Sequence, residues 1–427
     1  MSEVGAWAVK LGRRAAAGHS RDVERLDPNR LDVAILGGGL VGLTLGSALG
    51  QAGLAVAIVD PADPATQAAP GFDTRATAIA SASWRMFEAL GISGALLPHA
   101  CPIRAIRVSD GLKSGAIDFE PDDGEPLGLM VENRTLRAEL TGHVQASGVH
   151  LLAPARPVAV ERGMHEARVT LADGRTLTAA LLIACDGRRS PAREAAGIAM
   201  ARWSYDHAAI VGTLDHERPH DNVAFEIFYP TGPFALLPLQ PGTRSAFVWS
   251  VAKIDLAGLL KLGPRAFAHE LEARMGGLFG RLELVGGRTG YPLGFHHAAR
   301  ITGKRLALAG DAAHGIHPIA GQGLNLGLRD VAALAEVLAE GARLGLDLGD
   351  AQLLARYERW RALDITAIAA ATDSLTRLFG IPGRTASAVR RAGMAAVNAT
   401  PALKRFFMDE AKGTGGALPK LLMGETV

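Results

Sequence analysis

The apolar positions near the start of the chain fall into two short runs with a helical stretch between them. The first run, at 31–36, ends at glycines, and the second, at 55–59, ends at Asp60. The stretch at 40–52 is typical of a helix and is closed by Gly53. Short apolar runs bounded by turn residues predict buried strands. The order strand, glycine-rich turn, helix and strand therefore predicts a βαβ unit at the start of the fold.

Strand-like runs dominate the middle of the chain. A hairpin turn at 173–174 precedes a buried strand at 177–185. Further runs between 208 and 251 are separated by proline and glycine, and they predict an antiparallel sheet of the kind that forms a wall over a ligand. The apolar residues at 305–309 predict one more strand, and the pattern from Leu326 onward is helical.

Length and composition indicate a large folded protein. The chain has 427 residues, of which 48% are hydrophobic and 21% charged, so an extensive core is expected. The net charge of +2 argues against a nucleic-acid partner. Two cysteines, Cys101 and Cys185, cannot build a disulfide framework, which favours a reducing compartment. The sequence has no run of about 18 uncharged apolar residues, so we expect no membrane span.

The first part of the chain, residues 1–30, differs from the rest. It contains five arginines and no pattern that continues into the fold. The acidic residues scattered among these arginines argue against a transit peptide. We therefore expect a flexible N-terminal segment at 1–30.

Three motifs carry the candidate chemistry, and the first is a GxGxxG turn. Gly37 permits the tight turn, Gly39 lets a pyrophosphate approach the backbone, and Gly42 lets the helix pack closely on the strand. The helix N-terminus adds free N–H groups that suit phosphates. Asp60 follows the second strand about 20 residues on, where a carboxylate is expected to hydrogen-bond an adenosine ribose. The turn predicts dinucleotide binding but does not distinguish NAD from FAD.

The other two motifs place an aspartate at the end of a predicted strand. One is DGRRSPAR, which begins at Asp186, and the other is Gly310-Asp311. Asp311 is suited to accept a hydrogen bond from a ribityl hydroxyl. Either aspartate alone is equally consistent with a cap at a strand-to-turn junction. The joint occurrence of the three motifs in this order argues against chance.

These motifs resemble those of a known family. The chain from Leu31 to about Gly413 resembles the single-component flavoprotein aromatic hydroxylases typified by para-hydroxybenzoate hydroxylase. DGRRSPAR resembles their DGxxSxxR element, and the later Gly-Asp pair resembles their GD element, so the resemblance implies FAD rather than NAD. Within the family the chain looks most like the hydroxylases of ubiquinone biosynthesis, because HPIAGQGLNLGLRD at 317–330 is close to that group's signature. TGPFALLPL at 231–239 is also similar to its sheet.

The resemblance implies an α/β fold with a Rossmann-type FAD-binding domain, an antiparallel-sheet substrate domain and a helical C-terminal region. We expect the FAD-binding domain at 31–200 and 285–345, the substrate-covering sheet at 201–284 and the helical region at 346–427. The implied reaction is FAD-dependent hydroxylation of a polyprenylated phenol with O2, through a flavin C4a-hydroperoxide. Electrons come from NAD(P)H or from a ferredoxin system, and the sequence leaves both open.

The resemblance also places two arginines at the flavin. Arg75 and Arg134 stand where the family has flavin-contacting side chains, and Arg75 is within reach of the pyrophosphate. A surface arginine is the alternative for each.

The glycine-rich segment near residue 320 is expected to lie against the flavin ring. Gly321, Gln322 and Gly323 allow the backbone to approach a flat ring system, and Asn325 follows within the same signature. The helix that begins near Leu324 would direct its positive end at the ring, which favours the reduced flavin.

His314 and Pro318 are expected near the reacting edge of the flavin, although we assign no catalytic acid or base. The spacing of His314 and His317 is compatible with a metal pair. Because no carboxylate or thiol follows at ligand spacing, we expect no metal site.

The C-terminal segment 376–427 has eight Lys or Arg residues against three Asp or Glu, with leucine and phenylalanine interleaved. Such a basic amphipathic surface suits an anionic membrane face or a quinone-biosynthesis complex, and a helix packed on the core is the alternative. We expect a cytoplasmic protein, with peripheral attachment to the inner face of the membrane as the hypothesis for how it collects a lipid substrate. The oligomeric state stays open.

Two other functions fit the same motifs. The first is another FAD chemistry of this fold, either small-phenol hydroxylation or polyprenyl reduction. The second is a non-catalytic FAD-containing subunit of a quinone-biosynthesis complex. A halogenase is disfavoured because the sequence lacks a WxWxIP element.

Overall fold

The βαβ unit predicted from the apolar pattern is present in the structure, a computed structural model of the chain. β1 (Leu31–Leu36), α2 (Leu40–Gln51) and β2 (Val56–Val59) follow one another with nearly the predicted bounds. The predicted flexible segment 1–30 lies outside the described residues. The structure describes residues 31–69, 73, 75–112, 116–121, 124–315, 322–362, 364–365, 381 and 383–427.

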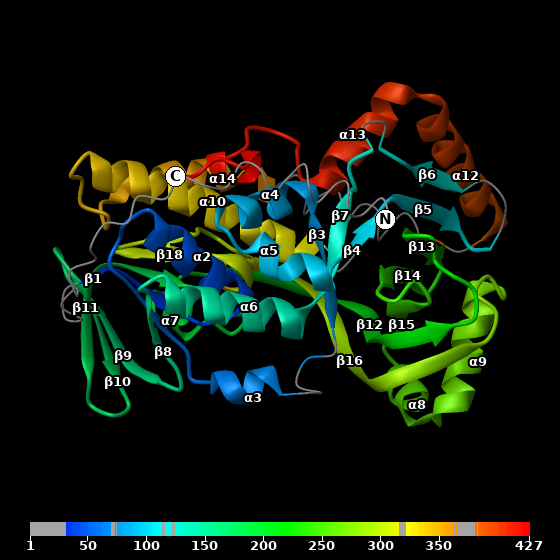
Figure 1. Cartoon of the computed structure of the whole chain (residues 1–427), viewed down its shortest axis with the longest axis horizontal. Helices are drawn as coiled ribbons and strands as arrows, with labels where there is room; N and C mark the ends of the chain where they lie inside the picture. Colours follow the sequence, from blue (N-terminus) through cyan, green and yellow to red (C-terminus); the bar gives the residue numbers. More distant parts are fainter. Residues whose placement is uncertain are drawn as a thin grey trace.

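The first sheet is largely parallel and has the order β17-β18-β11-β1-β2-β8 (Figure 1). From β18 to β8 every neighbouring pair is parallel, and the hairpin β9–β10 extends antiparallel from the first half of β11. A mostly parallel sheet with helical connections is the arrangement expected of a Rossmann-type domain. The remaining strands are β8 (His150–Leu152), β9 (Pro157–Arg162), β10 (Ala167–Leu171), β11 (Thr176–Ala184), β17 (Thr302–Gly303) and β18 (Leu306–Leu308).

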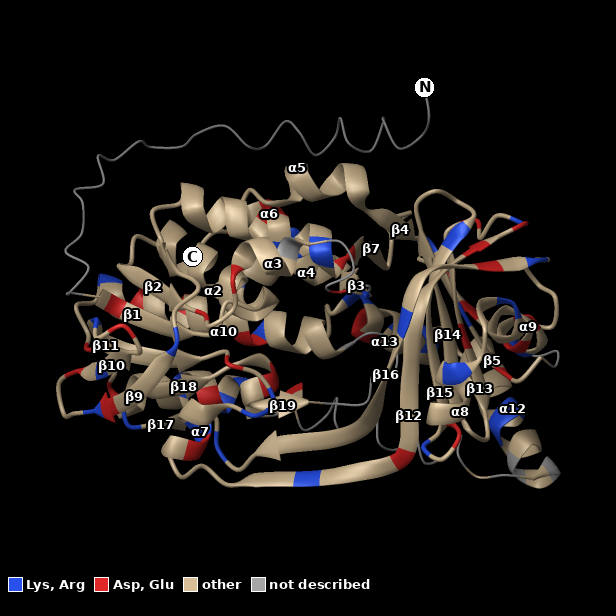
Figure 2. Cartoon of the chain, turned by 90° about the horizontal axis from the view of Figure 1, so that it is seen from below, with Lys and Arg blue, Asp and Glu red and all other residues tan. Residues whose placement is uncertain are grey.

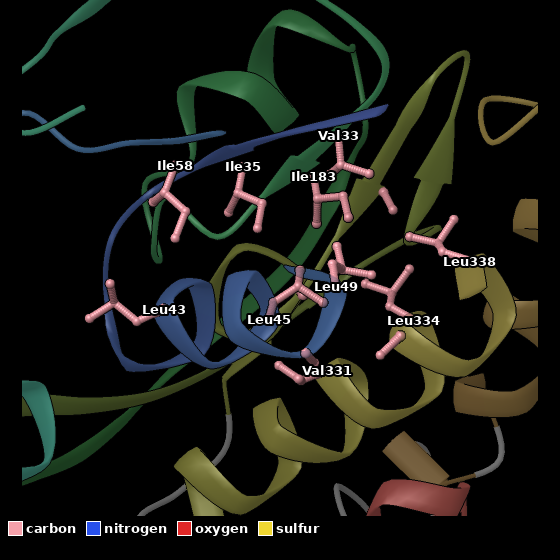
Figure 3. Packing of buried hydrophobic residues seen from close by; sticks show 14 of the residues in the cluster. Val33, Ile35, Leu43, Leu45, Leu49, Ile58, Ile183, Val331, Leu334 and Leu338 are labelled. Atoms are coloured by element: carbon pink, nitrogen blue, oxygen red, sulfur yellow. The ribbon is translucent and has the colours of Figure 1, made fainter. Parts of the chain in front are cut away.

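Helices α2 and α10 (Gln322–Arg343) pack together against this sheet. Figure 3 shows Leu45 and Leu49 of α2 meeting side chains of the strands and of α10. These residues are fully buried, as are Ile35 of β1 and Leu334 of α10. Fully burying each such side chain contributes about 1.5–3 kcal/mol, so this cluster fixes the position of both helix N-termini relative to the strand ends.

The second sheet is built around two long antiparallel strands, β12 (Met200–His216) and β16 (Leu282–Ala298). They run side by side and connect this sheet to the first domain (Figure 2). The strand order is β19-β16-β12-β15-β14-β13-β5-β6. The other strands are β5 (Ala105–Asp110), β6 (Ile117–Phe119), β13 (Val223–Tyr229), β14 (Gly232–Leu239), β15 (Arg244–Ala252) and β19 (His314–Gly315).

This sheet extends beyond the range 201–284 that the sequence predicts. β5 and β6 come from the range assigned to the first domain, and β16 runs on to Ala298. One face of the sheet is covered by α8 (Leu256–Lys261) and α9 (Pro264–Met275), whose Phe267 is fully buried against it. The opposite face is therefore the one that is available to line a site.

A small third sheet, which the sequence analysis does not predict, joins the two larger ones. It contains β3 (Ala76–Ala80), β7 (Gly128–Glu132) and β4 (Cys101–Ile103) in the order β3-β7-β4. The short helices around it and elsewhere in the first domain are α3 (Pro64–Ala68), α4 (Ser81–Ala89), α5 (Ser93–Leu96), η1 (Leu97–His99), α6 (Asn133–Ala146), α7 (Pro191–Ala195) and η2 (Gly310–Ala312).

The described part of the C-terminal region is helical. Residues 351–362 form a helix, and α12 (Arg384–Ala399), α13 (Pro401–Lys412) and α14 (Lys420–Met423) follow. α14 returns to pack on α4 and α10, whereas α12 and α13 lie over the second sheet (Figure 1). No helix among the described residues is long and apolar enough to cross a membrane.

Candidate functional site

Three neighbouring parallel strands of the first sheet end at the same edge, and each ends in one of the three motifs. β1 leads into Gly37, β11 into Asp186, and β18 into Asp311. The pairing continues past the strands, because the amide of Cys185 donates to the Leu36 carbonyl oxygen at 2.7 Å. Ligands of open α/β sheets bind outside such carboxyl ends. The structure thus brings together the three motifs that the sequence singles out.

The glycines of the first turn have different tasks. A Cβ atom at Gly42 would lie 1.9 Å from the Gly37 carbonyl oxygen, and one at Gly37 would lie 2.3 Å from the Cys185 carbonyl oxygen. Gly37 also has a φ of +107°, which favours glycine. A Cβ atom at Gly39 would meet nothing within 4 Å. Gly37 and Gly42 therefore permit close backbone packing, whereas Gly39 leaves open space at the N-terminus of α2.

A cavity of about 600 Å³ connects this edge to the second sheet. Of the predicted site residues, Gly39, Arg75, Asp311 and Gly323 line it. The part formed by the second sheet, which we call the sheet wall, consists of Val211, Gly212, Glu226, Ala235, Leu237, Ala246, Phe247 and Val248. The cavity is therefore polar at the motif edge and largely apolar on the sheet wall, and its volume is in the range of small-molecule sites.

Two buried polar atoms at the motif edge have no partner within the described part of the chain. They are Oδ1 of Asp186 and Nε of Arg137. The other oxygen of Asp186 accepts from the amide of Ala192 at 3.1 Å, and burial raises the pKa of this carboxyl above its usual range. Buried polar atoms without partners are rare in folded proteins, so a bound molecule is their natural partner.

Arginines gather at the motif edge of the cavity. Arg75, Arg137 and Arg188 all line it. Arg75 is held by a two-pronged ion pair with Asp73, at 2.7 and 2.8 Å. Burial raises the pKa of the Asp73 carboxyl, but the contact with Arg75 outweighs this effect and keeps the pKa below its usual value. The clustered positive charge and the free N–H groups of α2 suit a diphosphate.

The second motif also fixes the third in place. Arg193, which is 1% exposed, donates from Nη1 to the carbonyl oxygen of Ala312 at 2.9 Å. Ser190 caps the start of α7 by accepting from the Arg193 amide at 3.1 Å. The motif therefore positions the loop that carries Asp311 as well as lining the cavity.

Asp60 lies at the end of β2, as predicted, but does not line the cavity. Its carboxylate accepts hydrogen bonds from the amide of Gly38 at 2.5 Å and from the amide of Ala62 at 2.8 Å. It therefore braces the glycine turn, and its hydrogen bond to a ribose stays a prediction.

His314 does not face the cavity. It is 2% exposed, and its Nε2 lies 2.7 Å from Oδ2 of Asp330. Asp330 also accepts from Nε of Arg361 at 2.7 Å and from the amide of Gly310 at 2.9 Å. This buried network holds the Gly310-Asp311 turn in place. Pro318, Gly321 and the side chain of Gln322 lie outside the described residues.

The structure brings neither Asn325 nor Arg134 to the cavity. Asn325 accepts from the Ala80 amide at 2.9 Å and donates to the Ala78 carbonyl oxygen at 2.8 Å, and these two hydrogen bonds tie α10 to β3. Arg134 is 42% exposed in its side chain and lies 3.8 Å from Glu132.

The cavity also contains residues that the sequence analysis missed. Arg137 lies one helical turn beyond Arg134 on α6, and this spacing was the available signal. Arg188 lines the cavity from within the second motif, although the sequence analysis did not single it out, and Asn133, Tyr291 and Glu226 line it without belonging to any of the three motifs. Among the described residues, no cluster of His, Cys, Asp or Glu is placed to hold a metal ion.

These features fit FAD. The open space at Gly39, the free N-terminus of α2 and the arginines match a diphosphate. Asp186 does not itself line the cavity, but it stands between the lining residues Cys185 and Gly187, and its unpartnered oxygen matches a sugar or ribityl hydroxyl. The fold and the site therefore define an FAD-dependent flavoprotein.

Comparisons with known proteins agree with this class. A family model described as an FAD binding domain matches residues 30–372. The chain is 45% identical over 398 residues to ubiquinone hydroxylase UbiL of Rhodospirillum rubrum, and this match covers 92% of this chain and 92% of that protein. It is 30% identical over 432 residues to the mitochondrial ubiquinone biosynthesis monooxygenase COQ6 of Homo sapiens, covering 88% of this chain and 91% of that protein.

The fold has solved counterparts as well. The structure of p-nitrophenol 4-monooxygenase PnpA from Pseudomonas putida has a TM-score of 0.74 at 18% identity, covering 91% of this chain and all of that one. The chain belongs to the family of FAD-dependent monooxygenases that includes the ubiquinone-biosynthesis hydroxylases. The predicted family, fold class and enzyme class are thus confirmed.

Proposed function

We propose that this enzyme hydroxylates the aromatic ring of a polyprenylated phenol in ubiquinone biosynthesis, with O2 as co-substrate. The observation that carries the proposal is the single cavity that joins the FAD-binding edge to the apolar sheet wall. An apolar wall suits a prenylated ring and keeps water away from it. The names of the relatives, a ubiquinone hydroxylase and a ubiquinone biosynthesis monooxygenase, support the same pathway.

Each part of the chain has a distinct task in this proposal. Gly39, Arg75 and Arg137 hold the diphosphate of FAD, and Asp186 and Asp311 hold its sugar and ribityl hydroxyls. Bound FAD supplies two-electron redox chemistry and the reaction with O2. The sheet wall orients the ring of the substrate and excludes bulk water. NAD(P)H and a reduced ferredoxin are the two candidate electron donors.

The direct test is deletion of the gene in its host, followed by mass analysis of prenylated quinone precursors. We expect a precursor that lacks one hydroxyl group to accumulate, and its structure identifies the ring position. Growth of the complemented strain under ¹⁸O2 should add one labelled oxygen to the quinone at that position. If no prenylated phenol accumulates, the ubiquinone assignment is wrong. Turnover of a prenylated substrate without O2 would instead establish a reductase.

We also propose that the C-terminal helices contact a membrane surface, where such a substrate resides. Leu403 and Phe406 on α13 are 42% and 56% exposed, and Val389 on α12 is 63% exposed. Arg405 is exposed on the same helix as the first two. Basic residues interleaved with exposed apolar side chains are typical of surfaces that bind anionic membranes.

A further inference from the structure

The sheet wall of the cavity contains one ionisable side chain among its described residues, Glu226 on β13. Directly across from it on β14 is Ala235, and on β5 it is paired with Val108. Ala224 and Phe228, which share its face of the strand, pack into apolar clusters. A carboxyl group therefore interrupts an otherwise apolar surface.

Glu226 is buried and has no partner among the residues that the structure describes. Its exposed fraction is 7%. Within the described chain, no hydrogen bond or ion pair is found for its carboxyl, and burial raises its pKa to about 8. Near neutral pH the group is thus largely an uncharged acid, with one O–H donor and free acceptor positions.

A purely structural role does not account for this residue. A leucine would continue the apolar wall without the cost of burying a polar group, and the buried carboxyl of Asp330, which has a structural role, is paired. Asp330 is fully buried and has three donors around it. An unsatisfied polar side chain that faces a cavity points to a ligand that completes it.

The hydrogen-bond partner of Glu226 is better assigned to the substrate than to the cofactor. Of the groups suited to FAD, Gly39, Arg137 and Asp311 come from the first domain and not from the sheet wall. β13 is four strands away from β16 in the second sheet, which corresponds to roughly 19 Å at the usual strand spacing. β16 lies at the end of this sheet that adjoins the motif edge: it pairs with β19, which follows the Gly310-Asp311 turn, and its Tyr291 lines the cavity near Arg75.

We infer that the carboxyl group of Glu226 forms a hydrogen bond with a ring oxygen of the phenolic substrate and so orients the ring in the cavity. This inference rests on the proposed function. A prenylated phenol is apolar except at its ring oxygens, and the sheet wall is apolar except at Glu226. The single polar contact thus selects the hydroxylated end of the molecule.

The test compares two soluble ligands that differ by one hydroxyl group, 2-prenylphenol and prenylbenzene. Their binding to the FAD-loaded enzyme is followed by the change in flavin absorbance, without turnover. We expect the wild type to bind the phenol about tenfold more tightly, which corresponds to one hydrogen bond. Glu226→Leu should bind both ligands with equal affinity within about twofold, and Glu226→Gln, which keeps a donor and an acceptor, should retain most of the preference.

Two controls separate the possible outcomes. Glu283→Leu replaces an exposed carboxylate on β16 outside the cavity and should behave as the wild type does. If Glu226→Leu does not fold, Glu226→Asp keeps the acid but withdraws it by one methylene, and its preference for the phenol should fall at least threefold. A Glu226→Leu or Glu226→Asp enzyme with an undiminished preference overturns the inference alone. A flavin-loaded wild type that neither binds nor hydroxylates prenylated phenols overturns the proposed function with it.

Discussion

At the scale of single residues, the glycine turn shows that one motif combines packing and binding. A side chain at Gly42 would collide with the backbone of Gly37, whereas a side chain at Gly39 would enter open space. Gly39 also has a φ of −73°, which any residue can adopt. The two positions are therefore expected to respond differently to substitution.

We predict that Gly42→Ala lowers the free energy of unfolding of the FAD-free protein by about 2 kcal/mol, because backbone has to move away from the new methyl group. Gly39→Val should leave that free energy unchanged to within about 0.5 kcal/mol but reduce bound FAD at least tenfold. Chemical denaturation and the ratio of flavin to polypeptide measure the two effects. A Gly39→Val protein that purifies with a full complement of flavin would show that the diphosphate does not approach this residue.

The sequence predicted the site residues that belong to motifs better than those that depend on distant contacts. Gly39, Arg75, Asp311 and Gly323 line the cavity as expected. Asn325 has its amide bonded to a strand 245 residues earlier in the chain, and no local pattern reports such a contact. Glu226 was missed because a single carboxyl in a strand has no motif, and its significance appears only when the wall around it is known.

At the scale of elements, two buried carboxylates join segments that are far apart in the sequence. Asp330 links the turn after β18 to the helix at 351–362. Asp110 at the end of β5 accepts hydrogen bonds from Ser387 and Arg390, and so fastens α12 to the second sheet. The sequence showed the helices but not these links, nor the third sheet, since both depend on non-local pairing.

We predict that Asp330→Asn destabilises the protein by about 3 kcal/mol at pH 7, because Arg361 loses a buried partner. Burial raises the pKa of Asp330, but the charges of His314 and Arg361 outweigh this effect and hold the pKa below its usual value. The stabilisation is therefore present above about pH 3.9, the value in an unfolded chain, and is lost as the pH falls through the lower folded value. The difference in the free energy of unfolding between the wild type and the variant should become smaller below about pH 4.

Urea unfolding at a series of pH values measures this difference in unfolding free energy. Asp118→Asn is the matched control, since Asp118 is paired with Arg107 at the surface, and it should cost at most about 1 kcal/mol. A gap that stays constant down to pH 2 would mean that Asp330 is not the charged partner in the network.

We predict that Asp110→Asn loosens α12 without affecting the first domain. Hydrogen bonds to a buried carboxylate contribute about 1.5–3 kcal/mol each, so losing the charge should speed amide exchange at 384–399 at least tenfold. Hydrogen exchange followed by mass spectrometry reports this change, with α2 as the internal reference. The exposed Asp173→Asn variant should exchange as the wild type does, and equal exchange at α12 in both variants would contradict the anchoring role.

At the scale of the whole molecule, the long strands β12 and β16 connect the FAD-binding domain to the second sheet (Figure 2). The cavity lies where these parts meet, and the C-terminal helices α12 and α13 lie over the same sheet (Figure 1). A lipid substrate that enters from a membrane would meet the sheet side of the molecule. The exposed apolar residues of α13 are on that side.

We predict that the double substitution Leu403→Ser and Phe406→Ser weakens binding to vesicles of phosphatidylcholine and phosphatidylglycerol about tenfold, since each side chain loses apolar area that the membrane would bury. Co-sedimentation measures the partition, and added salt should weaken the binding of both proteins, because the basic residues attract anionic lipid.

Met164→Ser is the matched control: Met164 is 77% exposed and lies at the turn between β9 and β10, at the other end of the molecule (Figure 1). Equal partition of the double variant and the wild type would place the lipid contact elsewhere, whereas loss of binding in the Met164→Ser control would show that vesicles bind any exposed apolar residue.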